Sequence, residues 1–203
     1  DHVQDVIVQA LSASPATTLL YDADDPLCAG IAVKIKKAGS KVLSFGIGED
    51  LNLPQERVRG GAFCQECGAP LTYAYHHYGQ LGDFSCPSCG FERGELDYAA
   101  RNVCVGIDGV SFDVVTRDGS CMGRIHAPWG GVYMVYNLLG AFVAALGAGV
   151  DLEQFQKTVD AYDPTNGRLQ RFSVKGRHVT LNLAKNPTGF NQNLGLLMSD
   201  PAP

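Results

Sequence analysis

The chain has 203 residues, 45% of them hydrophobic and 18% charged, which describes a globular protein with a sizeable core rather than a disordered tail. Its net charge of −5 argues against nucleic-acid binding, because phosphate binding draws its affinity from clustered Lys and Arg. No apolar run approaches the roughly twenty residues of a membrane span, and residues 1–5 lack the basic and apolar regions of a signal peptide. Its cysteine usage is typical of a reducing compartment, so we expect a cytoplasmic protein.

The first elements predict a βαβ unit. Residues 17–21 and 41–46 have the composition of strands, and residues 27–38 carry apolar side chains at helical spacing. Pro26 suits the first position of this helix, with Asp25 as its N-cap. Two strands joined by a helix run parallel, so the pattern predicts an α/β fold with a parallel sheet.

Two Cys-x-x-Cys pairs follow, each with a glycine directly behind it: Cys64 with Cys67, and Cys86 with Cys89. Such a turn directs two thiolates at one ion, and a tetrahedral Zn²⁺ takes four sulfurs at about 2.3 Å. A closed shell of four cysteines leaves no position for water or substrate, so the spacing predicts a structural zinc site. Two disulfides, or a redox pair, are the alternatives, although a redox motif needs only one pair and a βαβ setting.

The segment between the cysteine pairs predicts the hairpin of a zinc ribbon. Residues 71–75 and 79–84 are short extended runs around a turn. His76 and His77 lie at the expected tip of this hairpin. Because four cysteines already complete the metal shell, we expect both histidines to be exposed turn residues rather than ligands.

The second half of the chain predicts further strands, then helices, then another hairpin. Asp108-Gly109 and Asp118-Gly119 are turn signals between strands at 102–107, 111–116 and 121–126. Residues 132–146 predict an apolar helix, and a second helix begins at Asp151, with Gln154 three residues on as part of a capping box. Residues 172–174 and 178–181 flank Lys175-Gly176 as a hairpin, and residues 185–191 read as a loop before a final helix.

Several of these segments together resemble the MurT subunits, relatives of the ATP-dependent Mur ligases that build peptidoglycan stem peptides. The segments are residues 22–26 after a strand, the four-cysteine ribbon inserted after residues 60–63, residues 133–137, Gly167-Arg168, and residues 185–191. The resemblance covers nearly the whole chain. It implies a Mur ligase central domain with a P-loop-type parallel-sheet core whose N-terminal part is missing, an inserted Cys₄ zinc ribbon, and the start of a Rossmann-like C-terminal domain. The implied boundaries are 1–60 and 99–167 for the central domain, 61–98 for the ribbon, and 168–203 for the C-terminal part.

The resemblance also implies an ATP site. Asn137 matches the asparagine that hydrogen-bonds adenine, and Arg168 matches an arginine that faces the nucleotide near the domain junction. Without the family, Asn137 would be read as a polar residue at a helix start and Arg168 as a solvated loop arginine. The chain departs from the Mur pattern at Tyr133-Met134 and at Gln170, so no metal-binding role is carried over to these positions.

The sequence contains no Gly-x-x-x-x-Gly-Lys-Ser/Thr, the loop that cradles phosphates. We therefore read the chain as an internal fragment, assign it no catalytic residue, and expect it not to hydrolyse ATP alone. The complete protein implied by the resemblance uses ATP and Mg²⁺ to activate the α-carboxylate of the D-glutamyl residue of lipid II. Ammonia from a GatD-type glutaminase partner then gives D-isoglutamine. A generic amino-acid-adding Mur or folylpolyglutamate-type ligase, and a noncatalytic zinc-ribbon interaction domain, remain as alternatives.

Overall fold

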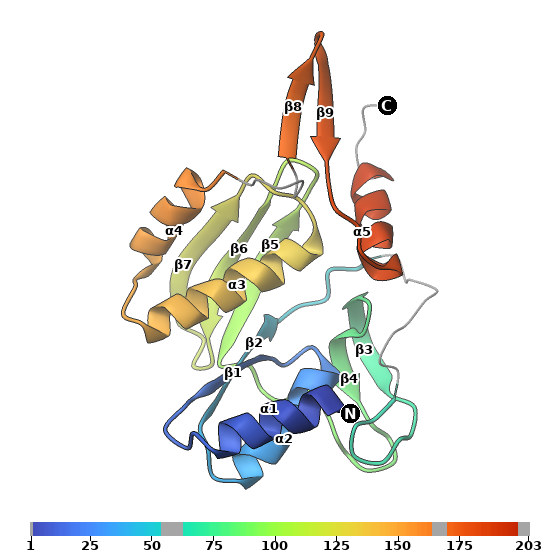
Figure 1. Cartoon of the computed structure of the whole chain (residues 1–203), viewed down its shortest axis with the longest axis vertical. Helices are drawn as coiled ribbons and strands as arrows, with labels where there is room; N and C mark the ends of the chain where they lie inside the picture. Colours follow the sequence, from blue (N-terminus) through green and yellow to red (C-terminus); the bar gives the residue numbers. More distant parts are fainter. Residues whose placement is uncertain (1, 54–62, 164–169, 199–203) are drawn as a thin grey trace.

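The computed structural model describes residues 2–53, 63–163 and 170–198 (Figure 1). A five-stranded sheet in the order β1-β2-β5-β6-β7 forms its centre. The central strands are β1 (Leu19–Asp22), β2 (Val42–Ile47), β5 (Tyr98–Val105), β6 (Val110–Thr116) and β7 (Cys121–Ala127). The helices are α1 (His2–Ser12), α2 (Pro26–Lys37), α3 (Val132–Gly147), α4 (Leu152–Ala161) and α5 (Pro187–Met198).

The predicted parallel sheet is confirmed. Strand β1 pairs in parallel with β2, and β2 in parallel with β5, whereas β5, β6 and β7 pair antiparallel as a meander. The predicted cap is also present, because Oδ1 of Asp25 accepts a 2.9 Å hydrogen bond from the backbone N–H of Leu27. Pro26 occupies the first turn of α2, where its missing N–H costs no intrahelical hydrogen bond.

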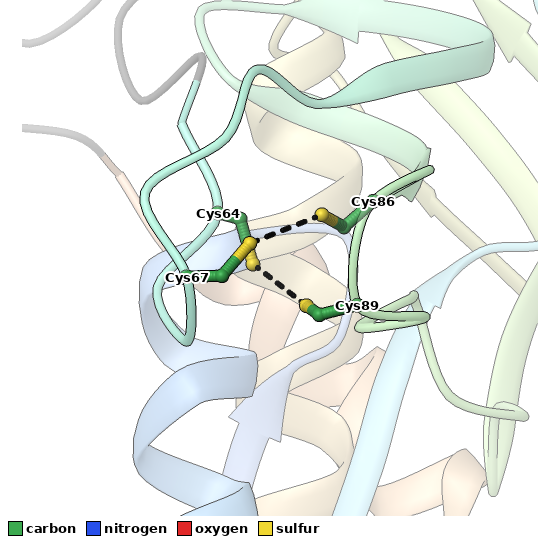
Figure 2. A group of neighbouring side chains, drawn as sticks. All are labelled: Cys64, Cys67, Cys86 and Cys89. Atoms are coloured by element: carbon green, nitrogen blue, oxygen red, sulfur yellow. Dashed lines mark hydrogen bonds between the residues drawn. The ribbon is translucent and has the colours of Figure 1, made fainter.

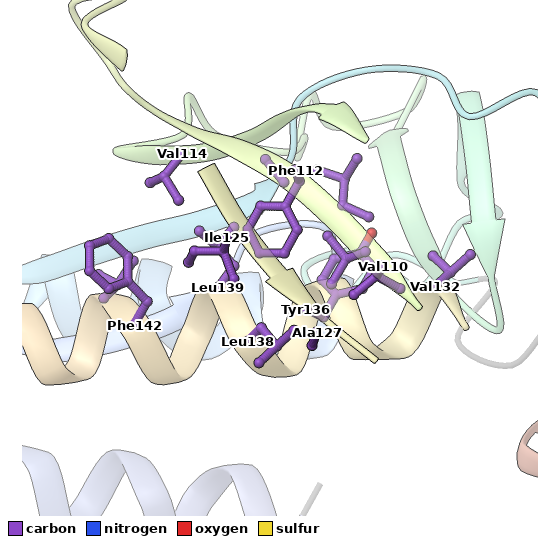
Figure 3. Close-up of a cluster of buried hydrophobic side chains, with 14 of the residues drawn as sticks. Val110, Phe112, Val114, Ile125, Ala127, Val132, Tyr136, Leu138, Leu139 and Phe142 are labelled. Carbon is purple, nitrogen blue, oxygen red and sulfur yellow. The ribbon is translucent and has the colours of Figure 1, made fainter. Parts of the chain in front are cut away.

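The main core lies between the sheet and α3. Neighbouring residues of a strand point to opposite faces of the sheet, as β1 shows. Leu20 packs in the main core, while Tyr21 packs on the other face, against a second apolar cluster formed by α2 and the ribbon. Figure 3 shows α3 laying its apolar face along the strands. The fully buried members of this core include Phe112, Val114, Ile125, Val135, Leu139 and Phe142.

The ribbon hairpin consists of β3 (Thr72–Tyr78) and β4 (Leu81–Ser85), which pair antiparallel beside the main sheet (Figure 1). The prediction that His76 and His77 are exposed turn residues is wrong. Both belong to β3 and both are buried, and the turn lies farther on, at Gly79-Gln80. The hairpin is turned toward the core at this end, so the two rings face protein rather than solvent.

The C-terminal hairpin is confirmed as β8 (Gln170–Val174) and β9 (Arg177–Leu181). Its turn places Lys175 at φ 49° and Gly176 at φ 73°, the left-handed pair that a two-residue hairpin requires. Helix α5 begins at Pro187, inside the stretch predicted as a loop, and Oδ1 of Asn186 caps it by accepting from the N–H of Gly189. Helix α1 was not predicted.

The domain boundaries implied after residues 60 and 167 fall outside the described residues, so they stay predictions. Within the described ranges, no helix has the length and apolar character needed to cross a membrane.

Candidate functional site

The four predicted zinc ligands converge on one point. The sulfur atoms of Cys64, Cys67, Cys86 and Cys89 all lie within 4.8 Å of one another, and Figure 2 shows the four side chains pointing toward a common centre. Two of the Sγ–Sγ distances are 3.5 Å, Cys64 to Cys89, and 3.6 Å, Cys67 to Cys86. A disulfide needs about 2.05 Å, whereas a tetrahedron of sulfurs about 2.3 Å from one ion has edges of about 3.8 Å. The donor set therefore fits a four-coordinate metal ion, and all four cysteines are free thiols.

Both cysteine turns have the same backbone geometry. The carbonyl oxygen of Cys64 accepts from the N–H of Gly68, and that of Cys86 accepts from the N–H of Gly90, each at 3.0 Å. Both glycines have φ of 76°, which explains why a glycine follows each pair. Burial raises the pKa of Cys86, but hydrogen bonds from backbone N–H groups of the same turn outweigh it and lower that pKa to about 7. For Cys89 in the same turn a backbone hydrogen bond lowers the pKa, but desolvation and the hydrogen bonds to the other cysteines outweigh it and raise that pKa to about 12. The lowered pKa therefore belongs to Cys86 and not to the turn as a whole.

The ribbon rests on the main domain through a small apolar cluster. Leu71, Phe84 and Phe91 of the ribbon are buried together with Ala29 of α2. The rings of Phe84 and Phe91 have centroids 5.3 Å apart. The cysteine end of the ribbon is thereby packed against α2, whereas the hairpin extends from it toward α3.

A buried polar network joins the ribbon to the carboxyl end of the parallel strands. Asp24, just after β1, is fully buried, and its Oδ1 accepts a 3.0 Å hydrogen bond from Nη1 of Arg93. Its Oδ2 accepts from the backbone N–H of Ile47 at 2.9 Å and from the Tyr136 hydroxyl at 2.7 Å. Burial raises the pKa of Asp24 to about 6, against the opposing effects of Arg93 and Tyr136. Asp24 therefore holds β2, α3 and the ribbon together.

His77 extends this network. Its Nδ1 lies 2.7 Å from the Tyr136 hydroxyl and its Nε2 lies 3.0 Å from the carbonyl oxygen of Glu49. With Tyr136 donating to Asp24, both ring nitrogens face oxygen acceptors, and a neutral imidazole has only one N–H. One further proton, on His77 or on Asp24, would give every close pair in this row a donor. Burial lowers the pKa of His77 to about 4 and raises that of Asp24 to about 6, so Asp24 takes up this proton only below about pH 6. Near pH 7 the imidazole is neutral and Asp24 is a carboxylate, which accepts from Arg93 and from the Tyr136 hydroxyl.

A pocket of about 580 Å³ lies beside this network. Asn137, the residue after Tyr136, is exposed and lines it, together with Tyr133 and Met134 of the same helix. Lys185 and the first turns of α5 line another side, and Tyr78 of the ribbon lines a third. The structure therefore brings together two segments, 133–137 and 185–191, that lie far apart in the sequence.

The chemistry of this pocket is a mixture of amides and aromatic rings. Its amides besides Asn137 are Asn182, Asn186, Gln192 and Asn193, and its remaining rings are Trp129 and Tyr162. Flat apolar surface with groups that can both donate and accept suits a heteroaromatic ring. Arg168, the other predicted nucleotide contact, lies outside the described residues. Tyr78 and Tyr136 were not singled out from the sequence, and His77 was predicted to be an exposed turn residue, because nothing local distinguishes them from ordinary strand and helix residues.

No protein-family model matches the chain. Among curated proteins, the MurT subunit of lipid II isoglutaminyl synthase from Staphylococcus aureus strain COL is 29% identical over 185 residues, covering 88% of this chain and 38% of that protein. The Streptococcus pneumoniae MurT subunit is 28% identical over 202 residues, covering 98% and 42%. The UDP-N-acetylmuramoyl-L-alanyl-D-glutamate--L-lysine ligase of Staphylococcus aureus strain MW2 is 33% identical over 76 residues, or 37% of this chain and 15% of that protein.

Two solved structures show the same fold. The pseudomurein peptide ligase type C from Methanothermus fervidus matches with a TM-score of 0.74 at 24% identity, covering 97% of this chain and 37% of that one. MurF from Acinetobacter baumannii matches with a TM-score of 0.59 at 19% identity, covering 97% and 33%. The chain spans about two fifths of the length of the MurT relatives. It is homologous to the MurT subunits over most of its length, and its fold is that of the Mur ligases.

Proposed function

We propose that the chain is part of an ATP-dependent ligase subunit of peptidoglycan biosynthesis that works in the cytoplasm. In this proposal the complete protein activates the α-carboxylate of the D-glutamyl residue in the lipid II stem peptide, and ammonia converts it to D-isoglutamine. A glutaminase subunit of the GatD type supplies the ammonia. The observation that carries the proposal is a four-thiol ribbon inserted into a Mur ligase fold, with the four sulfurs within 4.8 Å of one another.

The ribbon's proposed role is structural. Cys64, Cys67, Cys86 and Cys89 would hold one Zn²⁺, whose shell they complete, so the metal adds folding energy and takes no part in the reaction. Support comes from the distances between the sulfurs and from the matching geometry of the two turns.

The pocket's proposed role is to bind the adenosine part of ATP. The carboxamide of Asn137 can donate to and accept from the adenine edge at the same time. Arg168 would face the nucleotide from the junction, where its guanidinium suits phosphate or ribose oxygens. The Mg²⁺ that accompanies ATP, and the phosphate-binding loop, would belong to the complete protein.

The proposed reaction has two steps. A carboxylate is a poor electrophile, so an oxygen of the D-glutamyl α-carboxylate first attacks the γ-phosphorus of ATP, forming an acyl phosphate and releasing ADP. The nitrogen of ammonia then attacks the carbonyl carbon, phosphate departs, and the amide remains. Preorganised positive groups and Mg²⁺ lower the barrier of such steps by stabilising the charge that develops on phosphate.

The full-length protein tests this proposal, when supplied with its glutaminase partner, lipid II, MgATP and glutamine labelled with ¹⁵N in the side-chain amide. Mass spectrometry of the stem peptide should show one labelled amide, dependent on ATP and on the partner. Asn137→Ala should raise the KM for ATP, whereas Gln154→Ala, a matched exposed amide on α4, should not. Addition of an amino acid in place of an amide would instead establish the generic ligase, and no product with either donor would favour a noncatalytic role.

A further inference from the structure

The ribbon hairpin reaches the pocket at the end of β3. Tyr78 lines the pocket, and its ring meets that of Tyr136 edge to face, with centroids 5.9 Å apart and planes at 72°. The next residue, Gly79, lies against α5, since a Cβ built on it would be 3.4 Å from Cγ2 of Thr188. The hairpin therefore touches both helices that form the other sides of the pocket (Figure 1).

The position of Tyr78 is fixed by the residue before it. His77 contacts the Tyr136 hydroxyl through Nδ1 at 2.7 Å and the Glu49 carbonyl through Nε2 at 3.0 Å, and it is buried. Tyr136 is in turn held by Asp24 and is followed directly by Asn137. The buried contact between His77 and Tyr136 thus sets the distance between their neighbours in the pocket, Tyr78 of the ribbon and Asn137 of α3.

We propose that the ribbon forms one wall of the nucleotide pocket and that Tyr78 packs against the adenine ring whose edge Asn137 reads. The inference rests on the proposed function, since it names a contact within the same site. Aromatic side chains bind bases through their faces, whichever hydrogen-bonding groups the base carries, while an amide discriminates one base from another. Tyr78 then contributes affinity and Asn137 contributes selectivity, and the metal end of the ribbon serves to anchor the wall.

Adenosine is the probe that tests this contact, because it lacks phosphates and so needs no phosphate-binding loop. Titration of the chain with millimolar adenosine, followed by NMR of the backbone amides, gives the affinity and the residues that respond. Tyr78→Ala should weaken adenosine binding by about tenfold, from the loss of one base–aromatic contact. Tyr78→Phe keeps the ring and should bind within about twofold of the original chain. Asn137→Ala should reduce the preference for adenosine over cytidine.

Three outcomes separate this inference from the function on which it rests. Adenosine shifts at both Tyr78 and Asn137, with weaker binding by Tyr78→Ala at unchanged metal content and unfolding midpoint, support it. A response at Asn137 with full affinity in Tyr78→Ala overturns the ribbon wall and leaves the adenine site in place. If neither residue responds to adenosine, the pocket is not an adenine site and the contact with Tyr78 is overturned with it, while the labelled-glutamine assay still decides the proposed reaction.

Discussion

The Tyr136 hydroxyl donates a 2.7 Å hydrogen bond to Oδ2 of Asp24, and this contact joins α3 to the carboxyl end of β1. Both side chains are buried, and the Tyr136 oxygen also contacts His77 of the ribbon. Ligands of open α/β sheets bind beyond the carboxyl ends of the parallel strands. Here part of that edge is filled by an ionisable network, and the pocket opens next to it, at the first turns of α3.

Tyr136→Phe should lower the free energy of unfolding by about 1.5–3 kcal/mol, because it removes a donor from a buried carboxylate and leaves Nδ1 of His77 without its partner. Urea denaturation measures the change. Tyr162→Phe is the control, because Tyr162 is 60% exposed and its substitution should change stability by less than about 0.5 kcal/mol. Equal effects of the two substitutions would show that the network contributes nothing.

His77→Gln and Asp24→Asn should give unfolding free energies with opposite pH dependence. The pKa of Asp24 is raised to about 6, so its contribution is complete at low pH and is lost as pH rises through 6. The pKa of His77 is lowered to about 4, so its contribution is complete above its ordinary value and is lost as pH falls toward 4. Between pH 4 and 6 the folded and unfolded states each hold one proton on this pair, and the two contributions offset each other.

A variant that lacks one member of the pair should show the pH dependence of the member that remains. From pH 6 down to pH 4 the stability of His77→Gln should rise relative to the original chain, whereas that of Asp24→Asn should fall. Denaturation curves at three pH values in this window measure both slopes. If the unfolding free energies of the two variants change with pH in the same direction, the proton is not exchanged between Asp24 and His77 on folding.

Arg93→Met should destabilise the chain by about 3–5 kcal/mol, because it leaves the Asp24 carboxylate buried without its cation. Arg93 also pairs with Asp83 of β4 through Nε at 3.3 Å and lies over the ring of Tyr75 in β3, so it ties both strands of the ribbon to the core. The double variant Arg93→Met, Asp24→Asn should recover part of the loss, since no charge is then buried alone. If the double variant is as unstable as the sum of its parts, the ion pair is not the cause.

Gly46→Ala should be destabilising by about 1–3 kcal/mol, because a Cβ on β2 would lie 2.5 Å from Oδ1 of Asp24. Gly147→Ala is the matched control. Its Cβ meets nothing within 4 Å, and alanine favours the helix, so the change should be neutral or stabilising by up to about 1 kcal/mol. A thermal or urea unfolding comparison decides between crowding at Asp24 and a general intolerance of alanine.

Local signals in the sequence predicted the elements whose structure is set locally. The Asp25-Pro26 start of α2, the Lys175-Gly176 turn and the two cysteine turns each depend on a few adjacent residues, and each is present. The start of α5 was missed although Asn186-Pro187 carries a cap and a first-turn proline, because the Gly/Pro-rich composition was given more weight. Helix α1 was missed although its apolar residues Val3, Val6 and Ile7 recur at helical spacing; in the structure these three are substantially exposed, and the buried residue of this helix is the polar Gln4.

The buried network could not be predicted, because burial is a tertiary property. The residues around His77 are polar and aromatic, a composition that fits an exposed hairpin turn as well as it fits a strand. Its partners, Tyr136 and Glu49, lie 59 and 28 residues away. Asn137 was identified only through the family resemblance, and the structure adds that it is exposed beside Lys185 in one pocket.

The most direct test of this account is the metal content of the purified chain by elemental analysis. We expect one zinc per chain, lost in the double variant Cys86→Ser, Cys89→Ser together with the fold of the ribbon, and retained in Cys104→Ser, Cys121→Ser, whose two cysteines are exposed and outside the cluster. No zinc, with four free thiols in a fully folded chain, would contradict the structural ribbon and remove the observation that carries the proposed function.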